Sequence, residues 1–472
     1  MKNSQILEDK TDIFVEYPFL KLFHHDIFGL EISVEPIKGE WNLNLKNPLG
    51  YSPLINTPIL EHLNKEKNIG FDSKGRYWYS AFLPPISREN SEVFKKFLKV
   101  NIELSIKNQI KSKVGLYEHI PQAATIAITP KCNYKCEHCS FKTKNQGKEW
   151  NLDDLKNVID QLLKLGTYNI TFTGGEPLLY PHLEEAISYV DKKEAIVGMF
   201  TNGYFLTEKK AKSLYNAGLD YIFISLDSPV AKEHNKNRMG REDSDVFDRA
   251  IEATRIAKET GFVAGISTFM TPEKIKRGYL EKMYEFGEKL GVDEIVYFDL
   301  VPSGNLAILS GNQLLSHEDH KKLALFHIEK NKKGVKGPRA TTQSYVNFSE
   351  WSGGRCYAFN YQCYIDPEGE MFGCDFHDFS IGNVLEIGVK KAFENGANHP
   401  LYNTPCSQCR KQSPQFEPIR VVTNEIKKSK QRVVTLEEIE KFLAKNYGAN
   451  IPLTFNELER LRKEHKELRL DN

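Results

Sequence analysis

Residues 121–305 alternate short apolar segments with amphipathic segments of helical length, and this pattern constrains the fold more than any other feature. Apolar strands separated by helices favour a parallel sheet with right-handed crossovers. The predicted strands are Thr125–Thr129, Asn169–Thr173, Ala195–Phe200, Tyr221–Leu226, Phe262–Phe269 and Glu294–Leu300. Six such units predict an α/β fold, a partial (β/α)6 TIM-type barrel that falls short of the eight units of a closed barrel.

Regions of different character flank this predicted barrel. Residues 1–120 are expected to form an N-terminal α+β unit, a candidate for substrate recognition, with the aromatic segment Tyr77–Tyr79 in its core. Residues 306–420 are rich in loops and contain a predicted hairpin around 367–369. The charged segment Gly334–Arg339 in this region is expected to be a mobile, solvated turn, and the alternative is that Lys333, Lys336 and Arg339 contact the substrate.

The C-terminal residues 421–472 are predicted to form a helical hairpin tail. Thr435 with Glu438, and Thr454 with Glu457, have the spacing of two capping boxes at helix starts. Leucine and isoleucine residues recur at helical spacing after each box, so both helices are expected to pack against the body of the protein.

Composition and charge exclude several classes of protein. The 472 residues include 40% hydrophobic and 27% charged residues, an ordinary globular mixture, and the formal net charge is only +1. A balanced charge argues against a nucleic-acid partner. The N-terminal sequence lacks the pattern of a secretory signal, and no apolar run approaches 18 residues, so a membrane partner is not expected. We therefore expect a cytoplasmic location.

The eight cysteines are clustered rather than scattered. None occurs in the first 131 residues, three lie at Cys132, Cys136 and Cys139, and five lie between 356 and 409. Disulfide frameworks are typical of small secreted domains, which this chain does not resemble. Clustered cysteines in a chain of this kind indicate metal or cluster binding.

The first three cysteines have the spacing C-x3-C-x2-C in the loop after the first barrel strand. Three thiolates on one loop can ligate three irons of a [4Fe–4S] cluster and leave the fourth iron open. An open metal position is typical of a catalytic site, and ligand sites gather at this end of parallel strands. The alternative is a zinc site with His138 as the fourth ligand.

This loop resembles the signature of the radical S-adenosylmethionine (SAM) superfamily, and further matches follow later strands. They are Gly174-Gly175-Glu176-Pro177 after the second strand, Thr201-Asn202-Gly203 after the third, Ile224-Ser225-Leu226-Asp227 on the fourth, Arg238, and Val301-Pro302-Ser303-Gly304 after the sixth. Each match is weak alone, but in register with the cysteine loop they are specific. The resemblance covers roughly residues 121–305.

The resemblance implies a set of cofactor contacts. Glu176 and its neighbouring glycines would hold the amino group of SAM, Arg238 would meet its carboxylate, and the turn at Val301–Gly304 would cradle its adenine. The predicted cofactor-binding residues are His138, Gly174, Gly175, Glu176, Pro177, Thr201, Asn202, Ser225, Asp227, Arg238, Val301 and Gly304.

The resemblance also implies the chemistry. One electron from the reduced cluster would cleave SAM to methionine and a 5′-deoxyadenosyl radical, which would abstract a hydrogen atom from the substrate. An electron donor such as flavodoxin or ferredoxin would be needed. The protein would supply orientation and exclude water.

A second cysteine set has the pattern Cys356-x12-Gly369-x4-Cys374, followed by Cys406-x2-Cys409. It resembles the auxiliary-cluster domains called SPASM and twitch over about residues 350–412. Because no cysteine follows Cys409, the resemblance favours a twitch-like form with one fully ligated second [4Fe–4S] cluster. A zinc ribbon using the same four cysteines is the alternative.

Cys363 does not fit this ligand pattern. Its simplest role is that of a small buried residue on a hairpin strand. The alternatives are a substitute ligand or a catalytic thiol that donates a hydrogen atom to a substrate radical, as in peptide epimerases of the same superfamily.

Three hypotheses for function follow. The first is an enzyme that modifies a ribosomally made peptide. The second is an enzyme that oxidises or rearranges a small molecule in cofactor or natural-product biosynthesis. The third is a noncatalytic iron–sulfur electron carrier, which is disfavoured because a carrier does not need an open cluster with a SAM site.

Overall fold

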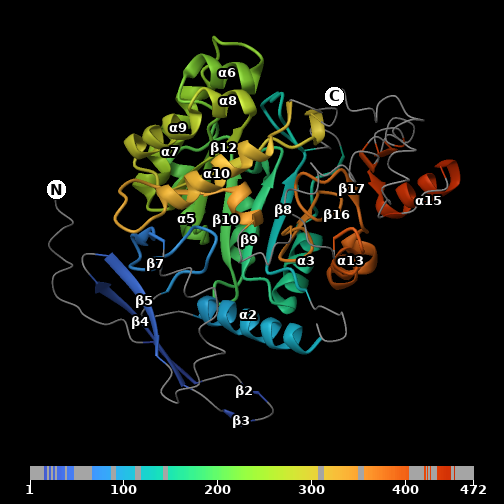
Figure 1. The fold of residues 1–472 in the computed structure, drawn as a ribbon, viewed down its shortest axis with the longest axis horizontal. Helices are drawn as coiled ribbons and strands as arrows, with labels where there is room; N and C mark the ends of the chain where they lie inside the picture. Colours follow the sequence, from blue (N-terminus) through green and yellow to red (C-terminus); the bar gives the residue numbers. More distant parts are fainter. Residues whose placement is uncertain are drawn as a thin grey trace.

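The protein is built around a parallel sheet with helices on its outer face (Figure 1). This computed structural model describes residues 15–18, 21–22, 25–26, 29–37, 40–46, 66–86, 92–111, 119–141, 147–306, 313–348, 356–402, 419–420, 422–423, 426, 433–447 and 451. The main sheet has nine strands in the order β14-β13-β12-β11-β10-β9-β8-β15-β16.

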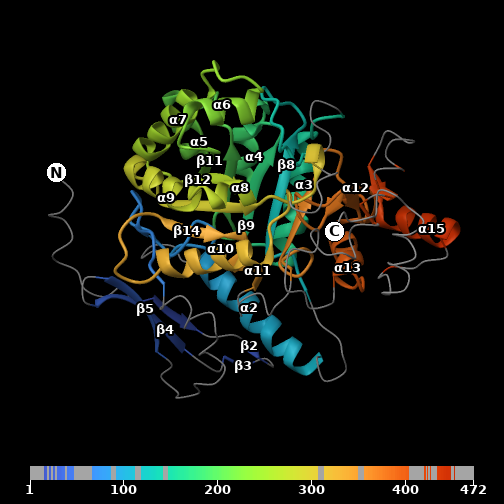
Figure 2. The same cartoon turned by 45° about the horizontal axis from the view of Figure 1, so that its top comes forward.

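The six predicted strand–helix units are all present, so the partial (β/α)6 barrel is confirmed. The strands are β8 (Ala123–Thr129), β9 (Asn169–Gly174), β10 (Ile196–Thr201), β11 (Tyr221–Ser225), β12 (Val263–Met270) and β13 (Glu294–Asp299). The helices are α3 (Leu152–Leu165), α4 (Leu183–Tyr189), α5 (Glu208–Ala217), α6 (Ala231–Met239), α7 (Val246–Thr260), α8 (Pro272–Lys276) and α9 (Tyr279–Leu290). Neighbouring strands pair in parallel, and these helices cover the outside of the curved sheet (Figure 2).

Local sequence signals set the ends of these helices. The side chain of Asn151 accepts hydrogen bonds from the first turn of α3, and Gly166 ends that helix with a φ of +106°. Gly218 ends α5 in the same left-handed conformation, at a φ of +96°. Glycine suits these positions because it has no side chain to clash there.

Alternation along the strands divides the barrel into an outer core and an interior. On β11, Ile222 and Ile224 belong to the apolar core that includes the helices, whereas Tyr221 and Phe223 belong to a separate interior cluster. Ser225, at the end of the same strand, lines the internal cavity. Successive side chains of a strand point to opposite faces, so each strand contributes to both sides.

Residues after the barrel extend its sheet at both edges. The elements are α10 (His317–Lys330), β14 (Arg339–Thr342), α11 (Gln343–Phe348), β15 (Gln362–Ile365) and β16 (Met371–Phe372). Strand β14 pairs in parallel with β13, and β15 pairs in parallel with β8. The predicted hairpin is confirmed, because β15 and β16 pair antiparallel.

The predicted solvated turn at Gly334–Arg339 is wrong for its last residue. Arg339 is only 4% exposed and begins β14 opposite Glu294. The register of this strand carries the guanidinium into the barrel interior, where carboxylates balance its charge. The charged composition of this segment predicted an exposed Arg339, but strand pairing buries it.

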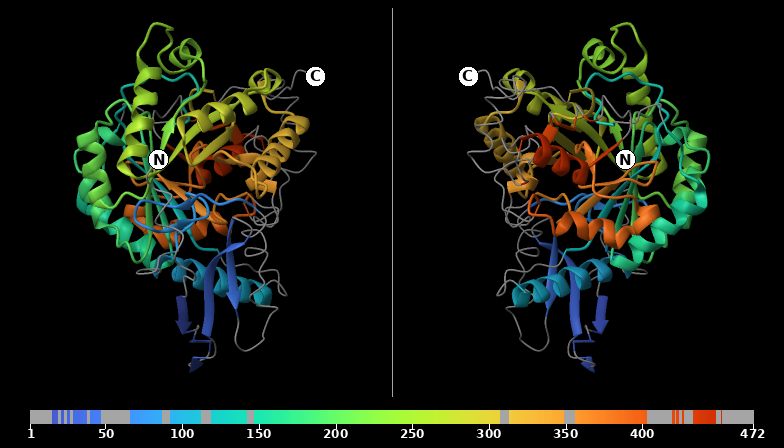
Figure 3. Two further views of the ribbon diagram at one scale, coloured as in Figure 1. Left: turned by 90° about the vertical axis from the view of Figure 1, so that its left-hand side faces the viewer. Right: turned by 90° about the vertical axis from the view of Figure 1, so that its right-hand side faces the viewer.

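The N-terminal region has two parts. An antiparallel sheet of β1 (Val15–Pro18), β4 (Gly29–Ile37) and β5 (Glu40–Lys46), with the small hairpin of β2 (Lys21–Leu22) and β3 (His25–Asp26), lies outside the barrel (Figure 3). The second part comprises β6 (Gly70–Phe71), β7 (Tyr77–Trp78) and α2 (Glu92–Lys111). Its segment 66–86 packs into the barrel, as described below.

The C-terminal elements are α12 (Val384–Ile387), α13 (Val389–Ala397), β17 (Phe379–Ser380), β18 (Val434–Thr435) and α15 (Leu436–Tyr447). The capping box at the start of α15 is confirmed, because Thr435 and Glu438 exchange both hydrogen bonds. The second predicted tail helix, with Thr454 and Glu457, lies outside the described residues. No described helix combines the length and apolar character that a membrane span needs.

Candidate active site

A cavity of about 510 Å³ occupies the barrel interior, between the cysteine loop and the N-terminal ends of the strands. Thr125, Thr171 and Thr173 line the cavity on β8 and β9, and Phe200 and Phe298 line it on β10 and β13. This volume is within the ordinary range of ligand-binding pockets.

The cysteine loop follows β8 and is fixed from two directions. The backbone N–H of Lys135 donates to the carbonyl of Arg238 at the end of α6, over 3.0 Å. Asn305 donates from its backbone to Cys139 O and from its side chain to Cys136 O, both over 3.0 Å. The loop is therefore held by the fold before any ligand binds.

The three thiols suit an iron–sulfur cluster. Cys132, Cys136 and Cys139 all line the cavity and share one small apolar cluster with Tyr134. The guanidinium of Arg238 lies 3.9 Å from Cys136 Sγ, where its charge favours a thiolate. Thiolates spread around one cavity fit a cluster, because each binds a different iron.

His138 lines the same cavity and already has two partners in its wall. Its Nε2 lies 3.5 Å from Asp227 Oδ2, and its ring packs on Phe269 with the centroids 4.0 Å apart. Burial lowers the pKa of His138 to about 3, so the ring is neutral near pH 7. In the described residues, no three His, Cys, Asp or Glu side chains form a single-ion site. Since Nε2 of His138 lies beside Asp227, a zinc site with His138 as the fourth ligand would have to use Nδ1.

Asp227 and Arg238 form a buried pair beside the loop. Arg238 Nε donates to Asp227 Oδ2 over 2.8 Å, and Nη2 donates to Oδ1 over 2.7 Å. Burial raises the pKa of Asp227, but the positive charges of Arg238 and Lys274 outweigh burial and hold this pKa well below its usual range. Asp227 thus occupies Nε and Nη2 of Arg238. The predicted contact of Arg238 with the SAM carboxylate would therefore have to use Nη1.

Glu176 connects the second and third motifs. Its carboxylate accepts from Thr201 Oγ1 over 2.5 Å, from Asn202 N over 2.8 Å and from Leu178 N over 3.1 Å. Asn202 in turn donates to Asn133 of the cysteine loop over 2.8 Å. Burial raises the pKa of Glu176 to about 7. A buried carboxylate that lines the cavity can accept from an ammonium group.

Three glycines allow the backbone to approach the cysteine loop. A Cβ on Gly174 would lie 2.5 Å from Thr129 O, and one on Gly175 would lie 2.1 Å from Lys131 O. A Cβ on Gly304 would lie 2.2 Å from Cys139 O. Gly304 therefore has a clear structural role against the loop, whereas its predicted contact with adenine stays a prediction.

Most of the predicted cofactor contacts surround one space. Those that line the cavity are His138, Gly174, Gly175, Glu176, Thr201, Asn202, Ser225, Asp227, Arg238 and Val301. Pro177 begins a short 3-10 helix behind Glu176, and Gly304 packs on the loop. Ser267, which the sequence interpretation missed, lines the cavity beside Ser225 with 3.4 Å between their hydroxyls.

Two cysteines of the second set line the same cavity. Cys356 precedes β15, and Cys374 follows β16. Cys406 and Cys409 lie outside the described residues. The ring of Tyr402, four residues before Cys406, packs on Phe359 with centroids 4.8 Å apart. The chain before the C-x2-C pair is therefore held beside the turn that follows Cys356.

Cys363 lies away from the cavity. It is 1% exposed on β15, opposite Ala124 of β8, and belongs to the apolar core under the helices. Its neighbour Gln362 points the other way and lines the cavity. Burial raises the pKa of the Cys363 thiol to about 12. This placement favours the structural role over the hydrogen-atom donor or substitute ligand.

Residues 66–86 form the floor of the cavity, and we call this segment the plug. The plug was expected to belong to a separate N-terminal unit, and Tyr77 and Trp78 are indeed buried in an apolar core. Phe82, however, stacks on Phe223 inside the barrel, with centroids 5.2 Å apart. Asn169 of β9 donates to Phe82 O over 3.0 Å.

The comparisons with known proteins agree with this geometry. Residues 126–298 match the family model described as the Radical SAM superfamily. A probable GTP 3′,8-cyclase of Methanococcus maripaludis is 36% identical over 146 residues, which cover 29% of this chain and 48% of the cyclase. The chain thus matches about half the length of that relative.

Two further similarities cover more of the chain. An AdoMet-dependent heme synthase of Oleidesulfovibrio alaskensis is 24% identical over 310 residues, or 60% of this chain and 78% of the synthase. Among solved structures, anSMEcpe with bound AdoMet has a TM-score of 0.49 and 21% identity, covering 62% of this chain and 89% of that one.

The barrel, the open cysteine loop and the adjoining polar site define an iron–sulfur enzyme of the SAM-dependent class. The matched segment, residues 126–298, is a Radical SAM domain, and enzymes of that superfamily use a [4Fe–4S] cluster and SAM. The predictions of family, fold class, enzyme and these two cofactors are thus confirmed.

Proposed function

We propose that this enzyme abstracts a hydrogen atom from a substrate held in the barrel cavity and passes an electron to a second cluster. One observation carries the proposal. The thiols of Cys132, Cys136 and Cys139 and those of Cys356 and Cys374 line the same cavity. A substrate between the two thiol sets would have a radical source on one side and an electron acceptor on the other.

The residues of this chain have distinct proposed tasks. The bound [4Fe–4S] cluster and SAM supply the radical chemistry. Glu176 would accept hydrogen bonds from the ammonium group of SAM, and the contact of His138 with Phe269 shapes part of the cavity wall. The Asp227–Arg238 pair holds the cysteine loop in place. The plug closes the floor of the cavity and excludes water there.

The second cluster would be held by Cys356, Cys374, Cys406 and Cys409. The packing of Tyr402 on Phe359 supports this assignment, because it leaves only a short connection to Cys406. Four thiolates would complete the ligation of the cluster, so it would transfer electrons rather than bind SAM. A zinc ribbon would offer no electron acceptor.

A peptide is the substrate class that we propose. The sheet β1-β4-β5 outside the barrel supports it, because β1 and β5 are its edge strands in the described chain. An extended peptide can add to such an edge while one of its side chains enters the cavity. The second candidate is a small molecule, which the names of the matched cyclase and heme synthase favour.

Iron content after anaerobic reconstitution tests the two-cluster proposal. We expect about eight irons per chain in the wild type and about four in the triple variant Cys132→Ala, Cys136→Ala, Cys139→Ala. The triple variant should also form no 5′-deoxyadenosine from SAM. Four irons in the wild type and almost none in the variant would overturn the second cluster.

Label transfer separates the two substrate classes. If a short reading frame next to this gene encodes a peptide, the deuterated form of that peptide should transfer deuterium to 5′-deoxyadenosine. A variant that lacks residues 1–65 but keeps the plug should bind this peptide less tightly. Unchanged peptide binding and no label transfer would favour the small-molecule alternative.

A further inference from the structure

Two phenylalanine rings inside the barrel form a surface that no step of the proposed function uses. Phe82 of the plug and Phe200 of β10 both line the cavity and stack on Phe223 of β11, with ring centroids 5.2 and 5.1 Å away. The three rings are nearly parallel, since their planes differ by 6° to 16°. Phe223 itself is fully buried, so it backs the other two rings.

The distance between Phe82 and Phe200 shows on which side of Phe223 they lie. Stacked rings are separated by about 3.5 Å, so rings on opposite faces of Phe223 would have centroids about 7 Å apart or more. The centroids of Phe82 and Phe200 are 6.5 Å apart. Both rings therefore lie side by side on the same face of Phe223, which also explains why both line the cavity. We call this pair of rings the platform.

A third ring stands at the edge of the platform. Phe298 of β13 lines the cavity, with its centroid 6.1 Å from that of Phe200 and its plane turned by 56°. Phe82, Phe200 and Phe298 are each only half-buried, so part of their apolar ring surface faces the cavity. An apolar surface exposed inside a cavity is typical of a ligand site.

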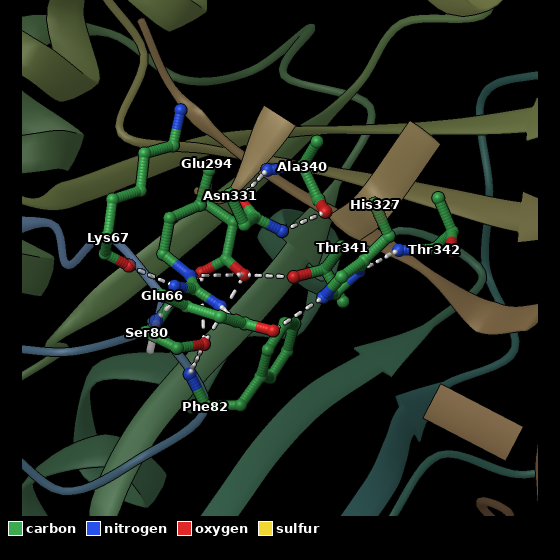
Figure 4. Close-up of polar contacts among 12 residues, drawn as sticks. Glu66, Lys67, Ser80, Phe82, Glu294, His327, Asn331, Ala340, Thr341 and Thr342 are labelled. Carbon is green, nitrogen blue, oxygen red and sulfur yellow. Dashed lines mark hydrogen bonds and ion pairs between the residues drawn. The ribbon is translucent and has the colours of Figure 1, made fainter. Parts of the chain in front are cut away.

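The fold holds the platform in place before any ligand binds. The backbone N–H of Phe82 donates to Ser80 Oγ over 3.4 Å (Figure 4), and the carbonyl of Phe82 accepts from Asn169 Nδ2 over 3.0 Å. A Cβ on Gly265 would lie 2.2 Å from the ring of Phe223, so this glycine leaves the space that the backing ring fills. A ligand would thus meet a preformed surface.

A flat surface with a wall at its edge suits an aromatic ring better than an aliphatic group. Aromatic pairs prefer offset-stacked and edge-to-face contacts, which contribute more than the area that they bury. A ring on the platform would stack on Phe82 and Phe200 and would meet the inclined ring of Phe298. A saturated ring of the same size would bury its carbons there but would gain neither contact.

We propose that the platform binds an aromatic ring of the substrate. The proposal rests on the proposed function in one respect, because it takes the cavity to be the substrate site. In a peptide substrate, the side chain that enters the cavity would then be that of phenylalanine, tyrosine or tryptophan. Phe82, Phe200 and Phe298 become specificity-determining residues.

Calorimetric titration of the anaerobically reconstituted full chain, with saturating SAM, tests this proposal. The probes are 2-phenylethanol, indole-3-ethanol and 2-cyclohexylethanol, three neutral alcohols of which the last has a saturated ring. We expect 2-phenylethanol to bind at least about threefold more tightly than 2-cyclohexylethanol. Indole-3-ethanol should bind most tightly, because its fused rings cover more of the platform.

Three results would overturn the proposal. A merely apolar cavity would prefer the more hydrophobic saturated ring, so 2-cyclohexylethanol would then bind at least as tightly as 2-phenylethanol. Absence of binding by all three alcohols at millimolar concentration would exclude a ring site. Binding that occurs only without SAM would assign the platform to the adenine of SAM instead of the substrate.

The variant Phe82→Leu locates the effect. It should weaken both aromatic alcohols by about threefold to tenfold and leave 2-cyclohexylethanol within about twofold. Phe286→Leu is the matched control, because Phe286 of α9 is also half-buried and stacks on Phe247, 6.1 Å away, but does not line the cavity. It should change none of the three affinities. Equal losses for all three alcohols in Phe82→Leu would indicate a merely structural role and overturn the assignment.

These outcomes are independent of catalysis. If Phe82→Leu does not fold, the three alcohols on the wild-type protein still decide whether the cavity prefers an aromatic ring. Binding needs neither cleavage of SAM nor a second cluster, so a failure here is distinguishable from a failure of the proposed reaction.

Discussion

The two ends of the cavity are built in different ways. At the cluster end, short contiguous motifs follow successive strands, and glycines bring backbone against backbone. At the floor, single residues from distant parts of the chain meet as charges and aromatic rings, with Glu66, Glu294 and Arg339 as the main example.

This difference follows from what each end has to bind. A cluster bound by one loop needs its thiolates at fixed spacing, so its ligands form a local pattern in the sequence. A network of buried charges needs only the folded chain to bring its members together. The cluster end should therefore respond to changes in backbone shape, and the floor to changes in charge.

The largest expected effect is at the cluster end. In Gly175→Ala the new Cβ would lie 2.1 Å from Lys131 O, so the turn after β9 must move away from the cysteine loop. We expect the iron content to fall by about four per chain, measured after anaerobic reconstitution. Gly240→Ala is the control, because its added methyl would meet no atom within 4 Å and costs only about 1 kcal/mol of backbone strain. Full iron content in Gly175→Ala would contradict the close-approach argument.

Removal of Arg238 should have the next largest effect. Arg238→Met leaves Asp227 buried without its opposite charge, which should lower the free energy of unfolding by about 3–5 kcal/mol. Urea unfolding at pH 7 measures it. Adding Asp227→Asn to this variant should recover part of the loss. A change below about 1 kcal/mol would mean that the pair does not anchor the loop.

The pH dependence of this pair has a definite sign. The folded-state pKa of Asp227 is depressed, so its contribution to stability is present above the unfolded-state pKa of about 4 and is lost as the pH falls. In Arg238→Met the buried carboxyl should prefer its protonated form, so stability should fall less, or even rise, on acidification.

Glu176 offers a smaller effect that depends on pH. Its pKa is raised to about 7 by burial, and only the ionised form attracts the ammonium group of SAM. The ionised fraction rises about tenfold from pH 6 to pH 8, so the affinity for SAM should rise by up to that factor. In Glu176→Gln, only the amino group of SAM can still titrate at this contact. The difference between the pH profiles of SAM affinity in the wild type and in this variant therefore reports on Glu176 alone. Identical pH profiles would contradict the proposed contact.

The same contrast explains what could be predicted from the sequence. The barrel strands and the cysteine loop were predictable, because alternation and thiol spacing are local properties of the chain. The plug and Arg339 were not, because their burial depends on pairing between strands that are distant in sequence. No local pattern distinguishes a charged residue that enters a barrel from one that stays in solvent.

The smallest expected effect tests whether the two ends act independently. Ser80 Oγ lies 3.2 and 3.3 Å from the carboxylate oxygens of Glu294, so Ser80→Ala removes one weak hydrogen bond at the floor. We expect the free energy of unfolding to fall by about 1 kcal/mol. Iron content and the affinity for SAM should match the wild type, because the hydrogen bonds described above for the cysteine loop and Glu176 do not involve the plug. A tenfold loss of SAM affinity in Ser80→Ala would show that the floor controls the cluster end. The claim that the cluster end responds to backbone shape and the floor to charge would then be wrong.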